Sequence, residues 1–281
     1  MRKAASFGAI VICLSLLAPA AGAQVPQDGV EPSPRLPRAD APPTPEKEPL
    51  RVRLAIGPQV QPGFPGNDSL RLGPMINVSR ARGDRPFGFG APGDGNAVSL
   101  LRSGRAEFGP LVRLEGQRRG DDLIEGLPRI GRTVEAGAFA QTWLGESVRL
   151  RGDLRKGIGG HKGWISQIGM DYVRRDGDHW LASLGPRVVF SDARYQRAWF
   201  GVSDEAAVRT GIAPYAPGGG IQSAGATSRV IFELTPRWGI QAQAMYARLI
   251  DDPGRSPLIR SEGSRDQLSA GIGLSYTFNI R

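Results

Sequence analysis

Polar and apolar residues alternate with a period of two along the C-terminal part of the chain. From 268 to 280 one set of alternate positions is apolar, and the other set is small or polar. This pattern predicts a β-strand with two different faces, near the length of ~9–11 residues that crosses a bilayer at a tilt. The apolar positions are Leu268, Ala270, Ile272, Leu274, Tyr276, Phe278 and Ile280.

The same texture recurs along most of the chain after residue 50. About twelve strands are expected, with ten to fourteen possible, and an even number fits an antiparallel up-and-down β-barrel without free edges. Short turns at Gly145-Glu146 and Asp176-Gly177 alternate with longer polar loops at 80–95, 119–131 and 251–264. The expected strands are 50–60, 69–80, 96–102, 105–118, 132–146, 147–158, 162–175, 178–191, 194–201, 226–235, 237–250 and 265–279.

A soluble β-sandwich would also show alternation, because it buries one face of each strand. The polar face of this chain, however, carries charged residues that suit a wet or ion-paired lumen, and aromatic residues near a strand end suit a membrane girdle. The sequence therefore favours an all-β transmembrane barrel. The lumen-facing candidates are Arg149, Arg151, Asp153 and Arg155.

The first 23 residues have the features of a secretory signal peptide. Arg2 and Lys3 precede an apolar run, and Ala21-Gly22-Ala23 is a cleavage pattern that places the cut between Ala23 and Gln24. Residues 24–49 contain eight prolines and few large apolar side chains, which predicts a disordered tether. The barrel is expected to occupy 50–281.

One segment departs from the strand pattern. Ser203 can cap a short helix near 203–210, Asp204 and Glu205 favour its first turn, and Gly211 can end it. The glycine runs at 157–160 and 218–220 are expected to be flexible turns, because neither is followed by the helix that a phosphate-binding loop needs.

The region 199–278 resembles the MipA/OmpV family, the MltA-interacting outer-membrane proteins. The resemblance lies in Phe200-Gly201-Val202-Ser203-Asp204-Glu205-Ala206-Ala207, in Pro217-Gly218-Gly219-Gly220, in Leu234-Thr235-Pro236-Arg237-Trp238 and in the ending Gly273-Leu274-Ser275-Tyr276-Thr277-Phe278. It implies a barrel in the bacterial outer membrane that links a lytic transglycosylase to a murein synthase. It also implies that the last strand, through Gly273, Leu274, Tyr276 and Phe278, is recognised by the barrel-assembly machinery.

Composition limits the chemistry that the chain can carry. One Cys and two His in 281 residues exclude an internal disulfide framework and a Cys/His zinc cluster, so we expect no metal, no cofactor and no catalytic site. His161 with Ser166, or His179 with Asp178 and Ser183, would be needed for a barrel enzyme. Both histidines are more readily explained as solvated residues near turns.

The formal charge of +9 points to an acidic partner. An exported chain with few interleaved aromatic residues disfavours nucleic acid, whereas arginines can pair with the phosphates of lipopolysaccharide. Arginines paired with acids inside the barrel explain the charge equally well. The candidate rim residues are Arg80, Arg82, Arg85, Arg102, Arg105, Arg118 and Arg119.

Three functions stay open at this point. The first is a non-enzymatic scaffold for murein-remodelling enzymes, the second is a porin-like channel for small solutes, and the third is a barrel enzyme that modifies envelope lipids. The family resemblance favours the first function.

Overall fold

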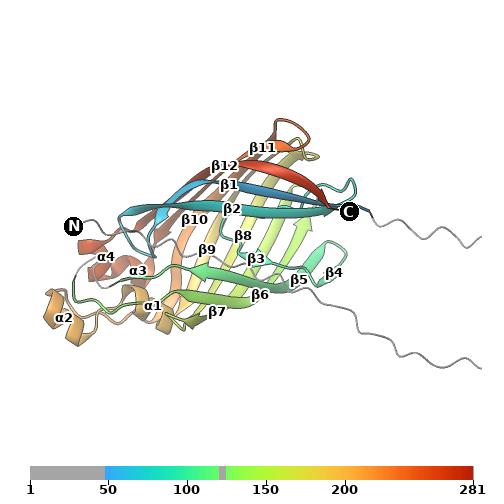
Figure 1. Cartoon of the computed structure of the whole chain (residues 1–281). Helices are drawn as coiled ribbons and strands as arrows, with labels where there is room; N and C mark the ends of the chain where they lie inside the picture. Colours follow the sequence, from blue (N-terminus) through green and yellow to red (C-terminus); the bar gives the residue numbers. More distant parts are fainter. Residues whose placement is uncertain (1–47, 120–124, 281) are drawn as a thin grey trace, which may run out of the picture. The chain divides into compact units, whose positions relative to one another are not determined.

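The computed structural model describes residues 48–119 and 125–280, and these form one antiparallel sheet with helices at one end (Figure 1). The expected signal peptide, its expected cleavage site at Ala23 and Gln24, and nearly all of the Pro-rich segment lie outside the described residues. The strands are β1 (Leu50–Pro62), β2 (Leu70–Arg82), β3 (Asn96–Ala97), β4 (Leu101–Ser103), β5 (Ala106–Glu115), β6 (Thr133–Leu144), β7 (Val148–Gly159), β8 (Trp164–Asp176), β9 (Trp180–Asp192), β10 (Gly219–Glu233), β11 (Trp238–Leu249) and β12 (Asp266–Ile280).

The sheet curls until its first and last long strands are neighbours. β1 pairs antiparallel with β12, with Leu50 opposite Ile280, and the strand order runs β2-β1-β12-β11-β10-β9-β8-β7-β6-β5-β3. The up-and-down topology that the sequence predicts is therefore confirmed. The pairing register of the strands follows from the alternation, because a shift by one residue would turn the apolar face of a strand inward.

Closure differs from the expectation at one place. Among the described strands, no ladder joins β2 to β3, β4 or β5, so the barrel wall has two edges there instead of none. The strand expected at 96–102 is broken into β3 and β4, although the backbone N–H groups of Val98 and Leu100 still donate to β5 at 3.1 and 2.9 Å. The residues that connect β2 to β3 pass into the lumen, which draws this part of the chain away from the wall.

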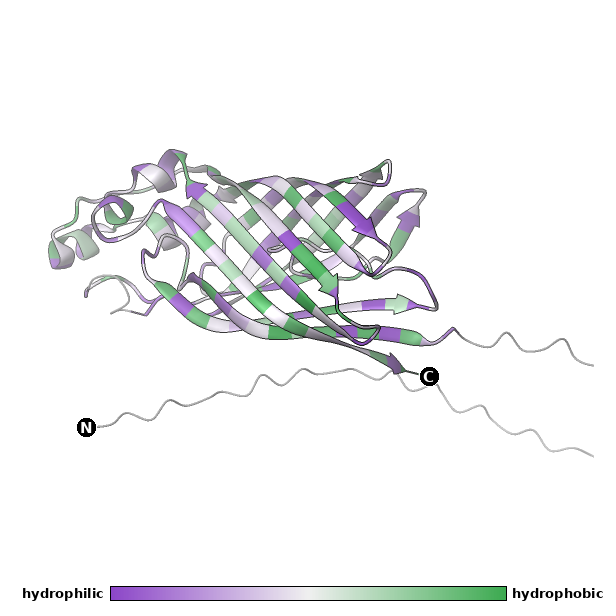
Figure 2. Cartoon of the chain, turned by 90° about the horizontal axis from the view of Figure 1, so that it is seen from above, coloured by the Kyte–Doolittle hydropathy of each residue, from purple (hydrophilic) through white to green (hydrophobic). Residues whose placement is uncertain are grey.

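The sheet is apolar outside and polar inside. Figure 2 shows the alternation of polar and apolar bands along each strand. Leu154 and Ile272 are 52% and 55% exposed, whereas Arg149 and Arg155 are each 1% exposed. A water-soluble sheet would bury the apolar side chains and expose the arginines. A sheet surrounded by lipid exposes apolar side chains to hydrocarbon, as this one does.

The two ends of the barrel differ. The terminal end carries the start of β1, the end of β12 and the short turns 145–147, 177–179 and 234–237. The helical end carries the connections β1–β2, β5–β6, β7–β8, β9–β10 and β11–β12, and its helices are α1 (Ala193–Phe200), α2 (Asp204–Thr210), α3 (Asp251–Arg255) and α4 (Pro257–Glu262). Among the described residues no helix is long and apolar enough to cross a membrane.

The strand expected at 194–201 is wrong, because this stretch forms α1. Asp192 caps the helix by accepting a hydrogen bond from the N–H of Tyr195 at 2.8 Å. Tyr195 and Trp199, one helical turn apart, are both buried, and Trp199 stacks on Phe64 with ring centroids 5.8 Å apart. Burial of these rings outweighs the weak alternation of the segment.

The helix expected near 203–210 is confirmed as α2. Ser203 accepts from the N–H of Ala206, and Gly211 ends the helix with φ 73°. The expected loop 251–264 instead contains α3 and α4. The glycine run at 218–220 is also not a free loop, since β10 begins at Gly219 and a side chain there would collide with the start of α1.

Candidate functional site: the lumen and the segment inside it

Residues 83–95, here called the lumen segment, connect β2 to β3 and lie inside the barrel. The segment leaves β2 at the terminal end and contains five glycines in thirteen residues. Phe87 and Ala91 within it are buried. Gly93 and Gly95 have φ values of 87° and 72°, which other residues rarely adopt. The sequence predicts this stretch as a polar surface loop, so its location inside the lumen was missed.

Arginines from the wall hold the backbone of the lumen segment. Their side chains reach into the lumen and donate to its carbonyl oxygens, so a segment without strand pairing still has hydrogen-bond donors for its backbone carbonyl groups. The donors and acceptors are Arg51 to Gly83 and Arg85 (2.8 and 2.5 Å), Arg175 to Phe87 (2.9 Å), Arg229 to Gly90 (2.5 Å), Arg113 to Gly93 (3.4 Å) and Arg151 to Asp94 (3.2 Å).

Asp94 is the charged anchor of the segment. Its carboxylate lies 2.8 Å from the guanidinium of Arg149 and 3.8 Å from that of Arg151, and it accepts from the N–H of Ala91 at 2.9 Å. Burial alone would raise the pKa of Asp94, but the two guanidiniums and the N–H group of Ala91 together hold it below its ordinary value. The segment is therefore tied to the wall by an ionised carboxylate.

The lumen-facing candidates Arg149 and Arg151 lie in the half of β7 nearer the terminal end, and both are buried. Arg149 also contacts Asp171 on β8 at 2.6 Å, and the same carboxylate binds Arg187 on β9 at 2.6 Å. Arg151 donates to Gln141 at 2.9 Å. These bonds link four adjacent strands, β6 to β9, and the lumen segment across the interior.

The other two candidates, Asp153 and Arg155, lie nearer the helical end. Arg155 binds Asp153 at 2.8 Å and Glu135 at 2.6 Å. Glu135 in turn contacts Nε2 of His161 at 3.1 Å, and Nδ1 of His161 accepts from the N–H of Gly163 at 3.1 Å. These four polar side chains occupy the interior between the wall and α1.

His161 differs from the expectation that both histidines are solvated, whereas His179 is exposed. His161 is 2% exposed, and its ring lies against Gly157, where a Cβ would approach within 2.3 Å. The glycine run at 157–160 thus makes room for a buried ring and is not a flexible turn. The side chain of His179 is 79% exposed and lies 3.5 Å from Asp176.

The rim arginines divide between surface and interior. Arg80 and Arg82 are exposed near the end of β2, whereas Arg118 is buried and donates to the carbonyl oxygens of Trp199 and Ala198 at 2.9 and 3.1 Å. A cation is favourable at that position because a helix C-terminus carries partial negative charge. Arg118 is therefore corrected from a rim residue to a cap of α1.

The last strand places its named residues on both faces. Leu274 and Phe278 face outward and are exposed, and Gly273 faces inward. Tyr276 stacks edge-on with both Trp238 and Phe278, at 4.7 and 4.8 Å between centroids. This outward aromatic cluster lies at the terminal end, where an interfacial girdle is expected.

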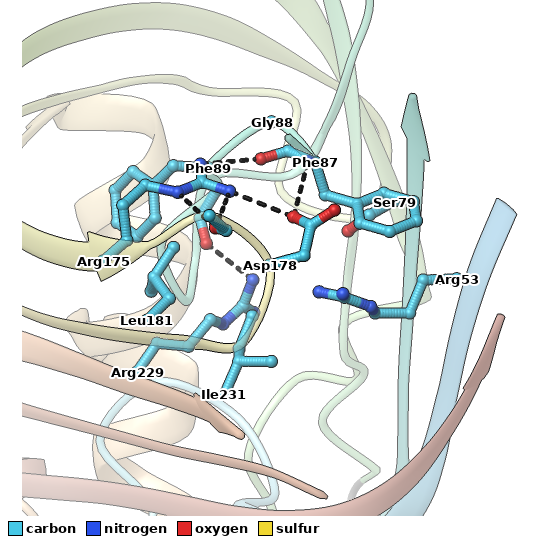
Figure 3. Close-up of a pocket in the computed structure, with 12 residues that line it drawn as sticks. Arg53, Ser79, Phe87, Gly88, Phe89, Arg175, Asp178, Leu181, Arg229 and Ile231 are labelled. Carbon is cyan, nitrogen blue, oxygen red and sulfur yellow. Dashed lines mark hydrogen bonds and ion pairs between the residues drawn. The ribbon is translucent and has the colours of Figure 1, made fainter. Parts of the chain in front are cut away.

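A small pocket opens between the lumen segment and the wall at the terminal end (Figure 3). Arg53 stacks on the ring of Phe87 at 4.1 Å and forms an ion pair with Glu233. Asp178 accepts from the N–H of Phe87 at 2.9 Å. Its carboxylate also binds Arg51 (3.0 Å) and Arg175 (3.2 Å).

The model of one protein family, described as MltA-interacting protein MipA, matches residues 54–278. The chain belongs to the MipA family. It is thus an outer-membrane β-barrel protein, as the outward apolar faces require. Among curated proteins none matches the chain significantly.

Solved structures resemble this MipA-family chain only distantly. An outer membrane channel from Pseudomonas putida is 10% identical, covers 87% of this chain and 100% of its own, and gives a TM-score of 0.36. OprG from Pseudomonas aeruginosa is 10% identical, covers 82% and 97%, and gives 0.26. A monoaromatic hydrocarbon channel, CymD, is 10% identical, covers 84% and 90%, and gives 0.32.

Sequence reasoning missed most of the interior network around the four lumen candidates. Glu135, Asp171, Arg187 and Arg229 occupy the polar positions of strands that the alternation does predict. Their place in the alternation was a usable signal, since every second residue of such a strand must face the lumen. Asp94 had no such signal, because it belongs to no strand.

Proposed function

We propose that the protein is a non-enzymatic scaffold of the outer membrane whose lumen is closed at rest, and that it organises murein-remodelling enzymes, a lytic transglycosylase and a murein synthase. The observation that carries the closed lumen is the lumen segment, which is held across the interior by arginines from five strands. The description of the family as MltA-interacting supports the choice of partner.

The terminal end is the side on which we place the partner. Outer-membrane barrels have short periplasmic turns and longer extracellular loops. The short turns 145–147, 177–179 and 234–237 share the terminal end, so this end faces the periplasm and the murein. The helical end then faces outward, where Lys156, which lies 5.0 Å over the ring of Trp164, is available to lipopolysaccharide phosphates.

Crosslinking in intact cells tests the scaffold. The full chain carrying an affinity tag is treated with a short crosslinker, and the captured proteins are identified. We expect the unmodified protein to capture a transglycosylase. Arg237→Glu, in an exposed turn at the terminal end, should capture less of it, and Arg260→Glu, at an exposed position of the helical end, should capture as much as the unmodified protein. Capture of no murein enzyme, or equal loss with both variants, contradicts the proposal.

A channel is the second candidate, and one observation favours it. From Gly83 to Gly95 the lumen segment makes no strand pairing, so the contacts that hold it are mainly side-chain bonds that can be broken without opening the wall. Recording in planar bilayers separates the two functions. Steady conductance of the unmodified protein favours the channel, and a silent protein favours the scaffold.

A further inference from the structure

The pocket at the terminal end has more positive than negative charge around it. Arg53, Arg175 and Arg229 line it together with Asp178. Adding the ion-pair partners Arg51 and Glu233 gives four guanidiniums facing two carboxylates, an excess of two positive charges. Charges held in so enclosed a place are screened less than at a surface, so the excess attracts an anion.

Arg229 is the cation with least compensation. It donates to Gly90 O at 2.5 Å, to Asn77 Oδ1 at 3.1 Å and to Gln243 Oε1 at 2.7 Å, all of them neutral oxygens. Its Nε is buried and has no partner in the described part of the chain, and no carboxylate pairs with it there. A buried guanidinium without an anion is costly, and an occupant of the pocket would remove that cost.

The lumen segment adds backbone donors at the same place. Gly88, Phe89 and Gly90 line the pocket, and within the described residues none of their N–H groups has an acceptor. These N–H groups are therefore free to donate to an occupant of the pocket. A Cβ on Gly88 would meet nothing within 4 Å, so there is space beside this backbone.

We propose that this pocket binds one small oxyanion, of phosphate or carboxylate type, from the periplasm. Arg229 and Arg175 supply the guanidinium donors, and the Gly88–Gly90 backbone supplies the N–H donors. An oxyanion fits better than a halide because guanidiniums match two oxygens at once. The occupant bridges the lumen segment and the wall, so it also holds the segment in place. The proposal is independent of the scaffold role.

The test uses the full folded protein in detergent at low ionic strength, with binding followed by calorimetry and by the midpoint of thermal unfolding. Inorganic phosphate and acetate are the two probes, and sodium chloride at equal ionic strength is the reference. We expect phosphate or acetate to bind and to raise the midpoint more than chloride does. The probe that binds more tightly identifies the oxyanion as phosphate-like or carboxylate-like.

Variants assign the binding to this pocket. Arg229→Gln should weaken binding at least about tenfold, equivalent to about 1.4 kcal/mol. Arg237→Gln removes an equal charge from an exposed turn at the same end and should bind as the unmodified protein does. Ser79→Glu places a carboxylate in the pocket without removing an arginine, so it should abolish binding even if Arg229→Gln fails to fold.

Three results would overturn the proposal. The first is that neither oxyanion exceeds chloride in the unmodified protein. The second is that folded Arg229→Gln keeps the full affinity, and the third is that Ser79→Glu does so. Migration of unboiled samples in gels, compared with boiled ones, shows whether each variant is folded.

Discussion

Asp94→Asn should release the lumen segment and open the barrel. The carboxylate is buried between Arg149 and Arg151, whereas the amide keeps the shape and an oxygen for the N–H of Ala91. Breaking a buried pair by removing one partner costs about 3–5 kcal/mol. Because Arg149 retains Asp171, we expect the lower end of that range, about 3 kcal/mol.

That free energy converts directly into the population of the released state. With a factor of ten for every 1.4 kcal/mol, about 3 kcal/mol raises the population of the released state about a hundredfold. Single-channel recording in planar bilayers measures this population. The unmodified protein should be almost silent, and Asp94→Asn should spend about a hundred times more of its time open.

Asp153→Asn is the matched control. Asp153 is also a buried carboxylate of the lumen, but its ion pair is with Arg155 on the same strand. Removing its charge should leave the lumen segment in place and the barrel closed. The reasoning fails if folded Asp94→Asn is as silent as the unmodified protein, or if Asp153→Asn opens equally often.

Three further predictions concern pH, the lipid face and the helical end. The pKa of Asp94 is held below 3.8, so its contribution is complete above that pH and is lost as the pH falls through the lowered value; conductance should stay low at pH 5–7 and rise only below about pH 4. Ile272→Arg, at the centre of β12 on the outward face, should cost about 2–4 kcal/mol in the free energy of unfolding, measured by urea titration in liposomes. Trp199→Ala should cost about 3–5 kcal/mol, because the ring is fully buried against Phe64, and should make residues 193–218 sensitive to protease.

Each of these has a contrary outcome. Openings that begin near neutral pH would show that Asp94 is not the anchor. An unchanged urea midpoint for Ile272→Arg would place Ile272 away from lipid, and protease resistance of Trp199→Ala would show that the stacked rings do not hold the helical end.

The wall of the barrel could be predicted from sequence because lipid imposes a strict rule on it. Every second residue of a strand meets hydrocarbon, so Leu150 and Leu154 must alternate with Arg149, Arg151 and Asp153. The pattern is local, and reading it needs no knowledge of partners. In the structure the three polar residues are buried and short connections lie at 145–147 and 177–179.

The lumen segment and α1 could not be predicted in the same way. A glycine-rich polar stretch such as 83–95 has the composition of a surface loop, and its place inside depends on arginines far away in the sequence, among them Arg175 and Arg229. In α1 the helical spacing of Tyr195 and Trp199 competes with a short alternation. Burial of both rings in a core shared with distant residues such as Phe64, more than a hundred residues earlier, favours the helix.

Spin labels on single cysteines test the central claim most directly. Cys13, in the expected signal peptide, is the only cysteine of the chain, so labels can be placed one at a time from 268 to 276. Apolar oxygen should reach even positions such as Ile272 and Leu274, while a water-soluble nickel complex should reach neither these nor the filled lumen at Ser269 and Ser275. Even positions shielded from oxygen, or odd positions open to nickel, would contradict a lipid-facing wall around a closed interior.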